Sequence, residues 1–146
     1  MSNQTKRLFL VTHGETEKDA GENPSLSALG KRQVSALRSS LLPSSMVTVA
    51  STKADRETAR ILFHPQVIAG DTDHWRSDDA MLIRSAICQL PDRAVICAGV
   101  ECLLALGKQA DELIDAGMYE VTVRGHDGMI ECFLIARGRV SEPPPE

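Results

Sequence analysis

The chain has 146 residues and a formal net charge of −4, from 16 Lys and Arg against 20 Asp and Glu. With 42% hydrophobic and 25% charged residues, its composition is that of an ordinary globular protein, which excludes a disordered or fibrous chain, and its length suits one domain. The mild acidic excess argues against a dedicated nucleic-acid or membrane-surface binder, because both need a basic face for phosphate groups.

The apolar stretches of the chain are too short for a signal peptide or a membrane span. Residues 8–11 fall short of the hydrophobic region of a signal peptide, and residues 94–107 carry Glu101 and fall short of the ~20 residues of a membrane helix. We therefore expect a cytoplasmic protein that contacts neither nucleic acid nor membrane. Its α/β domain is expected over residues 1–140, followed by a disordered tail at 141–146, whose three successive prolines favour neither helix nor sheet.

The four cysteines are predicted to be small buried hydrophobic residues. They are Cys88, Cys97, Cys102 and Cys132, and each lies among aliphatic or aromatic residues. No two of them have the two-residue spacing of a zinc knuckle or a redox pair, so a metal site or a disulfide is the less favoured alternative.

The first half of the chain alternates short apolar runs with segments of helical periodicity. The predicted elements are a strand over residues 8–11, a helix from Ser27 that Pro43 stops, a strand over 46–50 and a helix ending before Pro65. Ser27 provides the N-cap of the first helix, although Gly30 near its start lowers the helical propensity. Ser51 and Thr52 offer hydroxyl groups that cap the second helix.

The second half of the chain continues this alternation and ends in two strands. The predicted elements are a helix over 80–90, a strand over 94–97, a helix over 100–114 with a break at Gly107, and strands over 119–123 and 129–136. The segment 125–128 predicts a hairpin turn, a simpler account of His126 and Asp127 than a metal pair. The whole pattern predicts a three-layer α/β/α domain whose sheet is mostly parallel, with a C-terminal β-hairpin.

Polar residues follow the first two predicted strands. Thr-His-Gly-Glu-Thr at 12–16 follows the first, and Ser51 and Thr52 lead from the second to Arg56. An imidazole can attack phosphorus as a nucleophile, a guanidinium can hold phosphate oxygens, and Gly14 lets the backbone approach closely. Because ligands of such sheets bind at the carboxyl ends of the strands, the sequence predicts a site for one phosphate-like anion there.

Three blocks of the sequence have a recognisable order and spacing. They are Leu-Phe-Leu-Val-Thr-His-Gly-Glu-Thr at 8–16, Leu-Ser-Ala-Leu-Gly-Lys-Arg-Gln at 26–33 and Val-Ala-Ser-Thr-Lys-Ala-Asp-Arg-Glu-Thr-Ala at 49–59. Together they resemble the histidine phosphatase superfamily, also called phosphoglycerate mutase-like, and the short length is similar to its phosphohistidine phosphatase branch. The resemblance implies that fold and a phosphatase reaction through a phosphorylated His13, with Arg56 holding the phosphate. Thr12, Gly14 and Ser51, at the same two strand ends, are the further predicted phosphate contacts. No cofactor is expected, because the chain has no nucleotide-binding glycine motif and no convincing metal cluster.

The chain departs from the family pattern at two of four phosphate-contacting positions. The first strand of the family ends in Arg-His-Gly, whereas Thr12 precedes His13 here. A later strand ends in His-Gly, whereas Ala98 precedes Gly99 here. Neither Thr12 nor Ala98 supplies the lost positive charge, and losing one preorganised group that stabilises developing charge costs about 10²–10³ in rate.

Arg56 is the favoured second arginine of the pocket. Counting forward from Ser51 leads to Arg56, whereas matching the Arg-Glu-Thr-Ala run to the family places Ala54 at that position. The alternative for Arg56 is a surface ion pair with a neighbouring carboxylate. Glu101, if it faced the pocket, would repel a phosphate.

These departures predict a degenerate member of the superfamily that binds a phosphate-like anion or a partner, with weak or no phosphatase activity. The alternative is an active phosphatase with His13 as nucleophile, Arg56 as clamp and His74 in place of the missing histidine. The expected substrate or partner is a phosphorylated small molecule or a phosphohistidine protein. A third alternative is an interaction domain that has lost phosphate binding.

Overall fold

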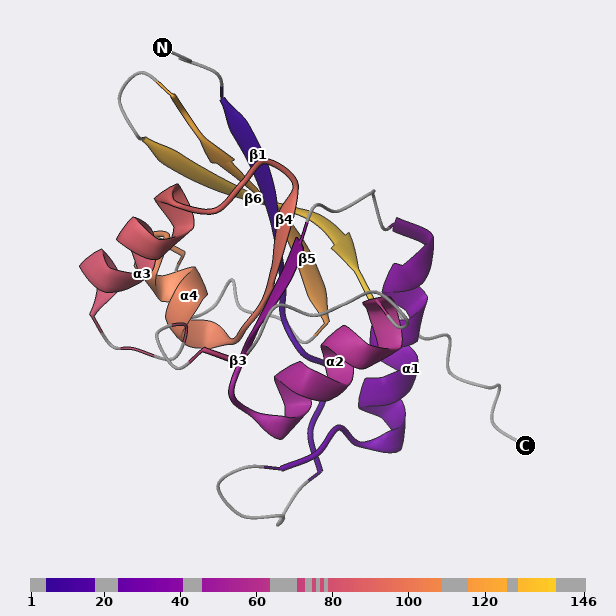
Figure 1. The fold of residues 1–146 in the computed structure, drawn as a ribbon. Coiled ribbons are helices and arrows are strands. Elements are labelled where there is room, and N and C mark those ends of the chain that lie inside the picture. The colour runs from indigo at the N-terminus through magenta and orange to yellow at the C-terminus, as the bar shows by residue number, and fades with distance from the viewer. Residues whose placement is uncertain are drawn as a thin grey trace.

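The computed structural model describes residues 5–17, 24–40, 46–63, 71–72, 75, 77, 79–108, 116–125 and 129–138. Within these residues, helices flank a six-stranded sheet (Figure 1). The elements are β1 (Lys6–Val11), α1 (Ala28–Ala36), the 3-10 helix η1 (Leu37–Ser40), β2 (Met46–Ala50), α2 (Lys53–Phe63), β3 (Asp71–Thr72), α3 (Ala80–Cys88), β4 (Ala94–Cys97), α4 (Val100–Ala105), β5 (Gly117–Val123) and β6 (Ile130–Arg137).

The sheet has the strand order β3-β2-β4-β1-β5-β6. β4 pairs in parallel with β1 on one side and with β2 on the other, and β2 pairs in parallel with β3. β5 is antiparallel to both β1 and β6, so among the described strands it alone runs against the others. The predicted mostly parallel sheet with a C-terminal hairpin is confirmed.

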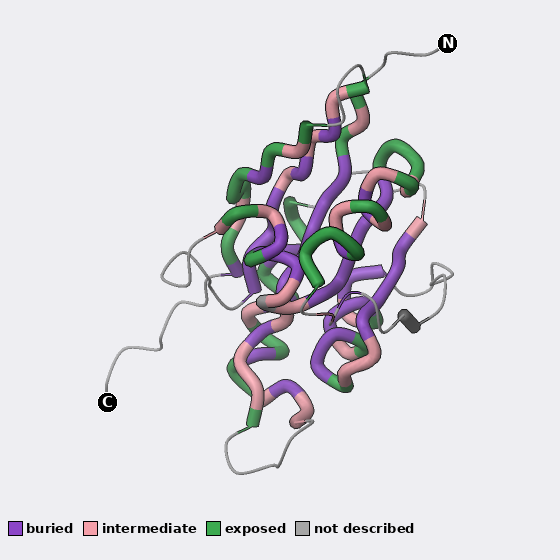
Figure 2. The backbone as a smooth tube through the Cα atoms, turned by 90° about the vertical axis from the view of Figure 1, so that its left-hand side faces the viewer, coloured by how far each residue is buried: buried purple, intermediate pink, exposed green. Residues whose placement is uncertain are grey.

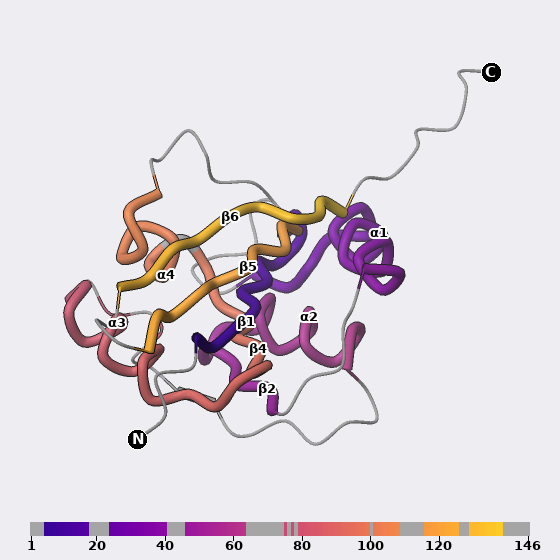
Figure 3. The backbone as a smooth tube through the Cα atoms, turned by 90° about the horizontal axis from the view of Figure 1, so that it is seen from above, coloured from indigo at the N-terminus to yellow at the C-terminus, as the bar shows by residue number. Residues whose placement is uncertain are grey.

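The helices cover both faces of the sheet, α1 and α2 on one side and α3 and α4 on the other (Figure 3). Along β1, Leu8 and Leu10 join the core under α3 and α4, whereas Phe9 and Val11 join the core under α1 and α2. This alternation follows from the two-residue period of a strand. Every residue of β4 is buried, and Figure 2 shows burial concentrated in the central strands. The predicted three-layer α/β/α architecture is confirmed.

The predicted cap of the first helix is confirmed. The hydroxyl of Ser27 accepts a hydrogen bond from the Gly30 N–H at 3.0 Å and caps α1. Gly107 follows α4 with a φ of +87°, a left-handed conformation that glycine adopts without strain. Residues 109–114 of the predicted helix and the tail at 141–146 lie outside the described residues. None of the described helices is long and apolar enough to cross a bilayer.

The cysteines behave mostly as predicted. Cys97, Cys102 and Cys132 are buried, whereas Cys88 at the end of α3 is half-buried, and all four are free thiols. Burial raises the pKa of the Cys97 and Cys102 thiols far above the ordinary value of 9.0. A thiol that keeps its proton is a poor nucleophile and a poor metal ligand, which agrees with a packing role for these two residues.

Candidate active site

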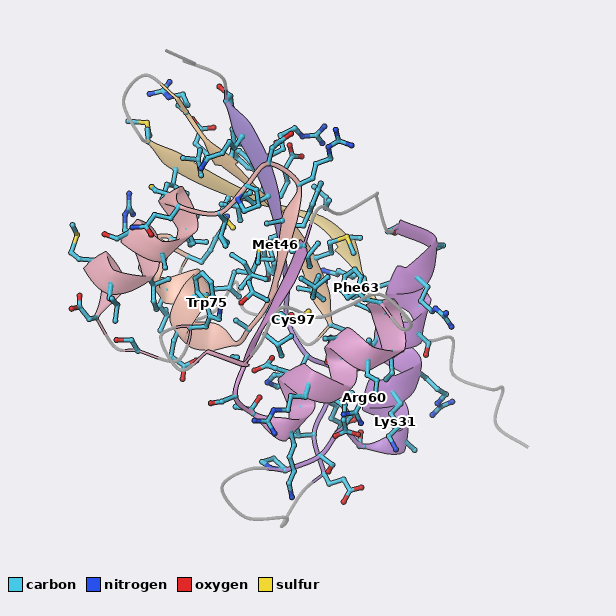
Figure 4. All side chains as sticks on the ribbon, in the orientation of Figure 1. Lys31, Met46, Arg60, Phe63, Trp75 and Cys97 are labelled. Atoms are coloured by element: carbon cyan, nitrogen blue, oxygen red, sulfur yellow. The ribbon has the colours of Figure 1, made fainter. Side chains whose placement is uncertain are left out.

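The carboxyl ends of β1, β2 and β4 lie at one edge of the sheet. Val11 of β1 and Val49 of β2 both pair with Cys97, the last residue of β4, which Figure 4 labels at the centre of the sheet. The next residue, Ala98, donates its N–H to the Val11 carbonyl at 3.2 Å. The register therefore brings Thr12 beside Ala98, the two positions where the sequence lacks the charged groups of the family pattern.

Thr12 ties the end of β1 to the start of β5. Its hydroxyl oxygen accepts a hydrogen bond from the Gly117 N–H at 2.7 Å, and its own N–H donates to the Gly117 carbonyl at 2.9 Å. The residue is buried, with 5% of its surface exposed. The hydroxyl thus satisfies a buried backbone donor, and its contact with a phosphate stays a prediction.

His13 is half-buried, and its ring contacts its own turn. The ring Nδ1 lies 2.8 Å from the carbonyl oxygen of Gly14. A carbonyl can only accept, so this hydrogen bond requires the proton to be on Nδ1, which leaves the lone pair of a neutral ring on Nε2. The backbone of the turn is also fixed, because the His13 carbonyl accepts from the Ala116 N–H at 2.8 Å. The tautomer of His13 is therefore the one in which Nε2 can act as a nucleophile.

Two glycines allow the His13 turn to cross the start of α1. A Cβ atom on Gly14 would lie 2.3 Å from the Gly30 carbonyl oxygen, and one on Gly30 would lie 1.9 Å from the Glu15 carbonyl oxygen. Hydrogen bonds hold the crossing, since the Ser27 N–H donates to the Glu15 carbonyl at 2.9 Å and the Glu15 N–H donates to Gln33 Oε1 at 2.9 Å. The second sequence block, at 26–33, thus serves to hold the turn that carries His13.

The first turn of α2 presents a carboxylate, not a guanidinium, to the protein interior. Asp55 is 2% exposed, and its Oδ2 accepts a hydrogen bond from the Thr52 hydroxyl at 2.6 Å. Ala54, the other candidate position for the second arginine, is buried as well, whereas Arg56 is exposed. Sequence reasoning missed Asp55, although the spacing of Thr52 and Asp55 resembles that of a capping box.

Asp55 lies close to the end of β4. Burial is the larger cause that raises the pKa of Cys97, and the negative charge of Asp55 is the second cause. For Cys102 in α4, burial acts first, then the charge of Glu101, then that of Asp55. A carboxylate disfavours a nearby thiolate. Asp55 and Glu101 therefore both lie near this part of the sheet and add negative charge there.

Glu101 stands in the first turn of α4, directly after the corner at Gly99. One of its carboxylate oxygens, Oε2, is 3.4 Å from the position that a Cβ atom on Gly99 would take. Gly99 offers no side chain to cap α4, and a negative group is favoured beside the free N–H groups of a helix start. Glu101 also lines a pocket of about 220 Å³ together with Ser77, Ala80, Leu104 and Ala105.

Known structures share this architecture, among them the three that follow, and the predicted phosphoglycerate mutase-like α/β/α fold is confirmed. Mycobacterial hydrolase 2 has a TM-score of 0.72 and 17% identity, over 94% of this chain and 93% of its own. A mycobacterial glucosyl-3-phosphoglycerate phosphatase has a TM-score of 0.66 and 17% identity, over 90% and 97%. The protein histidine phosphatase SixA, solved with tungstate, has a TM-score of 0.64 and 16% identity, over 90% and 95%.

No protein-family model and no curated protein matches the sequence. At 17% identity or less for these three structures, the likeness concerns the fold. One fold hosts many functions, so the chemistry of this chain has to be argued from its own side chains. His74, the predicted substitute for the missing histidine, lies outside the described residues.

Proposed function

We propose that this chain is a degenerate histidine phosphatase, which binds a phosphate-like anion or a partner and has weak or no phosphatase activity. The observation that carries the proposal is the pair of neighbouring strand ends at Thr12 and Ala98. Both residues are buried and uncharged, at the edge where the family places an arginine and a histidine. A phosphoryl group there would lack two of the groups that stabilise its charge in the transition state.

The two carboxylates of the site support the same conclusion. The charge of Asp55 acts on Cys97, the last residue of β4, and the Glu101 carboxylate lies beside Gly99, just after that strand end, so both add negative charge there. Like charges at short range disfavour a bound phosphate. If the loss at each of the two strand ends were independent, each would cost about 10²–10³ in rate, although catalytic groups often act as a unit and do not add in this way.

The groups left for anion binding are few. His13 and Gly14 lie on the turn after β1, and Ser51 and Arg56 lie at the start of α2. Both segments follow strands that end at one edge of the sheet, so one ligand between them is the arrangement that we propose. The proposed ligand is a phosphorylated small molecule or a phosphohistidine side chain, held without efficient turnover.

The second candidate is an active phosphatase, and the tautomer of His13 favours it. With Nδ1 bound to the Gly14 carbonyl, Nε2 would form a bond to phosphorus while the bond to the leaving oxygen breaks. Water would then hydrolyse the phosphorylated ring and release inorganic phosphate. This reaction needs charge stabilisation that Thr12 and Ala98 do not supply.

Turnover separates the two candidates. The intact chain and His13→Ala should be assayed with p-nitrophenyl phosphate and with a phosphohistidine peptide, and the proposal predicts the same low rate for both proteins. A rate for the intact chain that is well above background and vanishes in His13→Ala would establish the active phosphatase instead.

Titration calorimetry with tungstate and inorganic phosphate tests the anion site. We expect saturable binding that Arg56→Ala weakens and that Arg60→Ala, an exposed arginine one turn further along α2, leaves unchanged. Equal weakening by both variants would point to general surface charge. No binding to the intact chain would overturn the anion site and leave only a role in partner binding.

A further inference from the structure

The pocket between α3 and α4 has a mostly aliphatic lining with one carboxylate. Its volume is about 220 Å³, and its lining residues are Ser77, Ala80, Glu101, Leu104 and Ala105. Three of the five are aliphatic, one is a hydroxyl residue, and Glu101 is the charged one. Figure 4 shows Trp75 on the same side of the sheet, beside α4.

The carboxylate of Glu101 is available for a ligand. Within the described part of the chain, no hydrogen bond or ion pair engages it. Arg84 of α3 donates instead to the Ala105 carbonyl at 3.3 Å, near the other end of α4, and it is not a lining residue. A carboxylate beside aliphatic walls attracts a cation and repels an anion.

We propose that this pocket binds an aliphatic ammonium group on a short apolar stem. The ammonium forms a charge-assisted hydrogen bond with Glu101, and the stem lies against Leu104, Ala80 and Ala105. The volume is below the roughly 300–1,000 Å³ of pockets for drug-sized molecules, so it suits one group of the size of a lysine side chain. The source is either a free alkylamine or a lysine of a partner protein, because both carry the same chemistry.

This inference does not depend on the proposed function: Glu101 enters both, but the ammonium pocket lies between α3 and α4 and uses no group of the His13 turn. A result at His13, in either direction, leaves it unchanged. It also gives Glu101 a role beyond repelling phosphate, since the same carboxylate would favour a positively charged ligand in this pocket.

The test is an NMR titration of the labelled protein with n-butylammonium chloride, with n-butanol and sodium butyrate as matched probes at constant ionic strength. A five-heavy-atom ligand is expected to bind with a Kd of about 1–10 mM, with shifts that saturate at Glu101 and Leu104. Glu101→Gln should weaken binding at least about fivefold, since it replaces a charge-assisted hydrogen bond with a neutral one. Glu131→Gln, an exposed carboxylate on β6, is the matched control and should change nothing.

Ala80→Leu separates the pocket from loose surface attraction. Ala80 is exposed at the start of α3, so the larger side chain fills the pocket while Glu101 stays, and binding should be lost. Equal binding of n-butanol and n-butylammonium, or equal affinity of Glu101→Gln, would overturn the proposal, as would shifts that never saturate. A capped lysine, Nα-acetyl-lysine N-methylamide, keeps the side-chain ammonium and identifies the source. Binding at least as tight as that of n-butylammonium supports a partner lysine, and binding of n-butylammonium alone supports a free amine.

Discussion

Replacing Gly30 with alanine tests whether the crossing of α1 and the His13 turn holds this edge of the sheet together. The added Cβ atom would lie 1.9 Å from the Glu15 carbonyl oxygen, whereas real Cβ atoms essentially never approach closer than 3.0 Å. The two backbones must therefore separate by about 1 Å, and overpacking of this kind costs about 1–3 kcal/mol. The hydrogen bond from Ser27 N–H to the Glu15 carbonyl, worth roughly 1 kcal/mol, would be stretched as well.

Helical propensity acts in the opposite direction, since alanine in a helix is favoured over glycine by about 1 kcal/mol. The expected net effect of Gly30→Ala is a loss of about 2 kcal/mol in the free energy of unfolding. Urea unfolding measures it, with the fluorescence of the single tryptophan, the buried Trp75, as the signal. Ser35→Ala, at an exposed position of the same helix, is the control and should gain up to about 0.5 kcal/mol. A Gly30→Ala protein as stable as the original would refute the reasoning.

Three further experiments probe the strand ends and the buried thiols. Thr12→Val removes the acceptor of the Gly117 N–H and should lower the free energy of unfolding by about 1–3 kcal/mol in urea. Thr12→Ser keeps the hydroxyl and should lower it less, so equal losses in the two variants would contradict this role. Burial raises the pKa of Cys97 and Cys102 above 9.0, so as pH rises the unfolded chain loses these protons before the folded chain does. The free energy of unfolding should therefore fall above about pH 9, by about 1.4 kcal/mol for each thiol and each pH unit. Cys97→Ala should make that pH dependence shallower, and an unchanged slope would refute the assignment. Thr12→Arg combined with Ala98→His should bind tungstate more tightly than the original chain in calorimetry. No gain in affinity in a folded double variant would mean that these two strand ends do not form the anion site.

The architecture was predictable because its signals are local. The apolar run at 8–11 predicts a buried strand by itself, and the glycine-rich segment at 125–128 predicts the joint between β5 and β6 without knowledge of any distant residue. Gly30 is different. From the sequence it only lowers helical propensity, and its reason appears once the Glu15 carbonyl is found where a side chain would stand.

The polar residues of α2 could not be placed from the sequence. Whether Ala54, Asp55 or Arg56 faces the interior depends on the helix face that packs on the sheet, and one residue of helix turns a side chain by about 100°. The family pattern directed attention to a cation, so Arg56 was favoured, yet the buried ionisable residue of this turn is Asp55. The spacing of Thr52 and Asp55 was a local signal for this outcome, because a threonine followed three residues later by a carboxylate is typical of a helix start.

The features that preserve the fold are separate from those that would supply phosphatase chemistry. The Gly14–Gly30 crossing, the Ser27 cap and the bond between Thr12 and Gly117 all act through backbone atoms or neutral side chains. None of them requires a positive charge at the strand ends. Threonine at position 12 satisfies a buried N–H group that would otherwise need a partner, so this edge of the sheet is held without a charged side chain there. The contacts that hold the His-Gly-Glu-Thr turn in the fold run through its backbone and through Gly14, so the turn by itself is no evidence for catalysis.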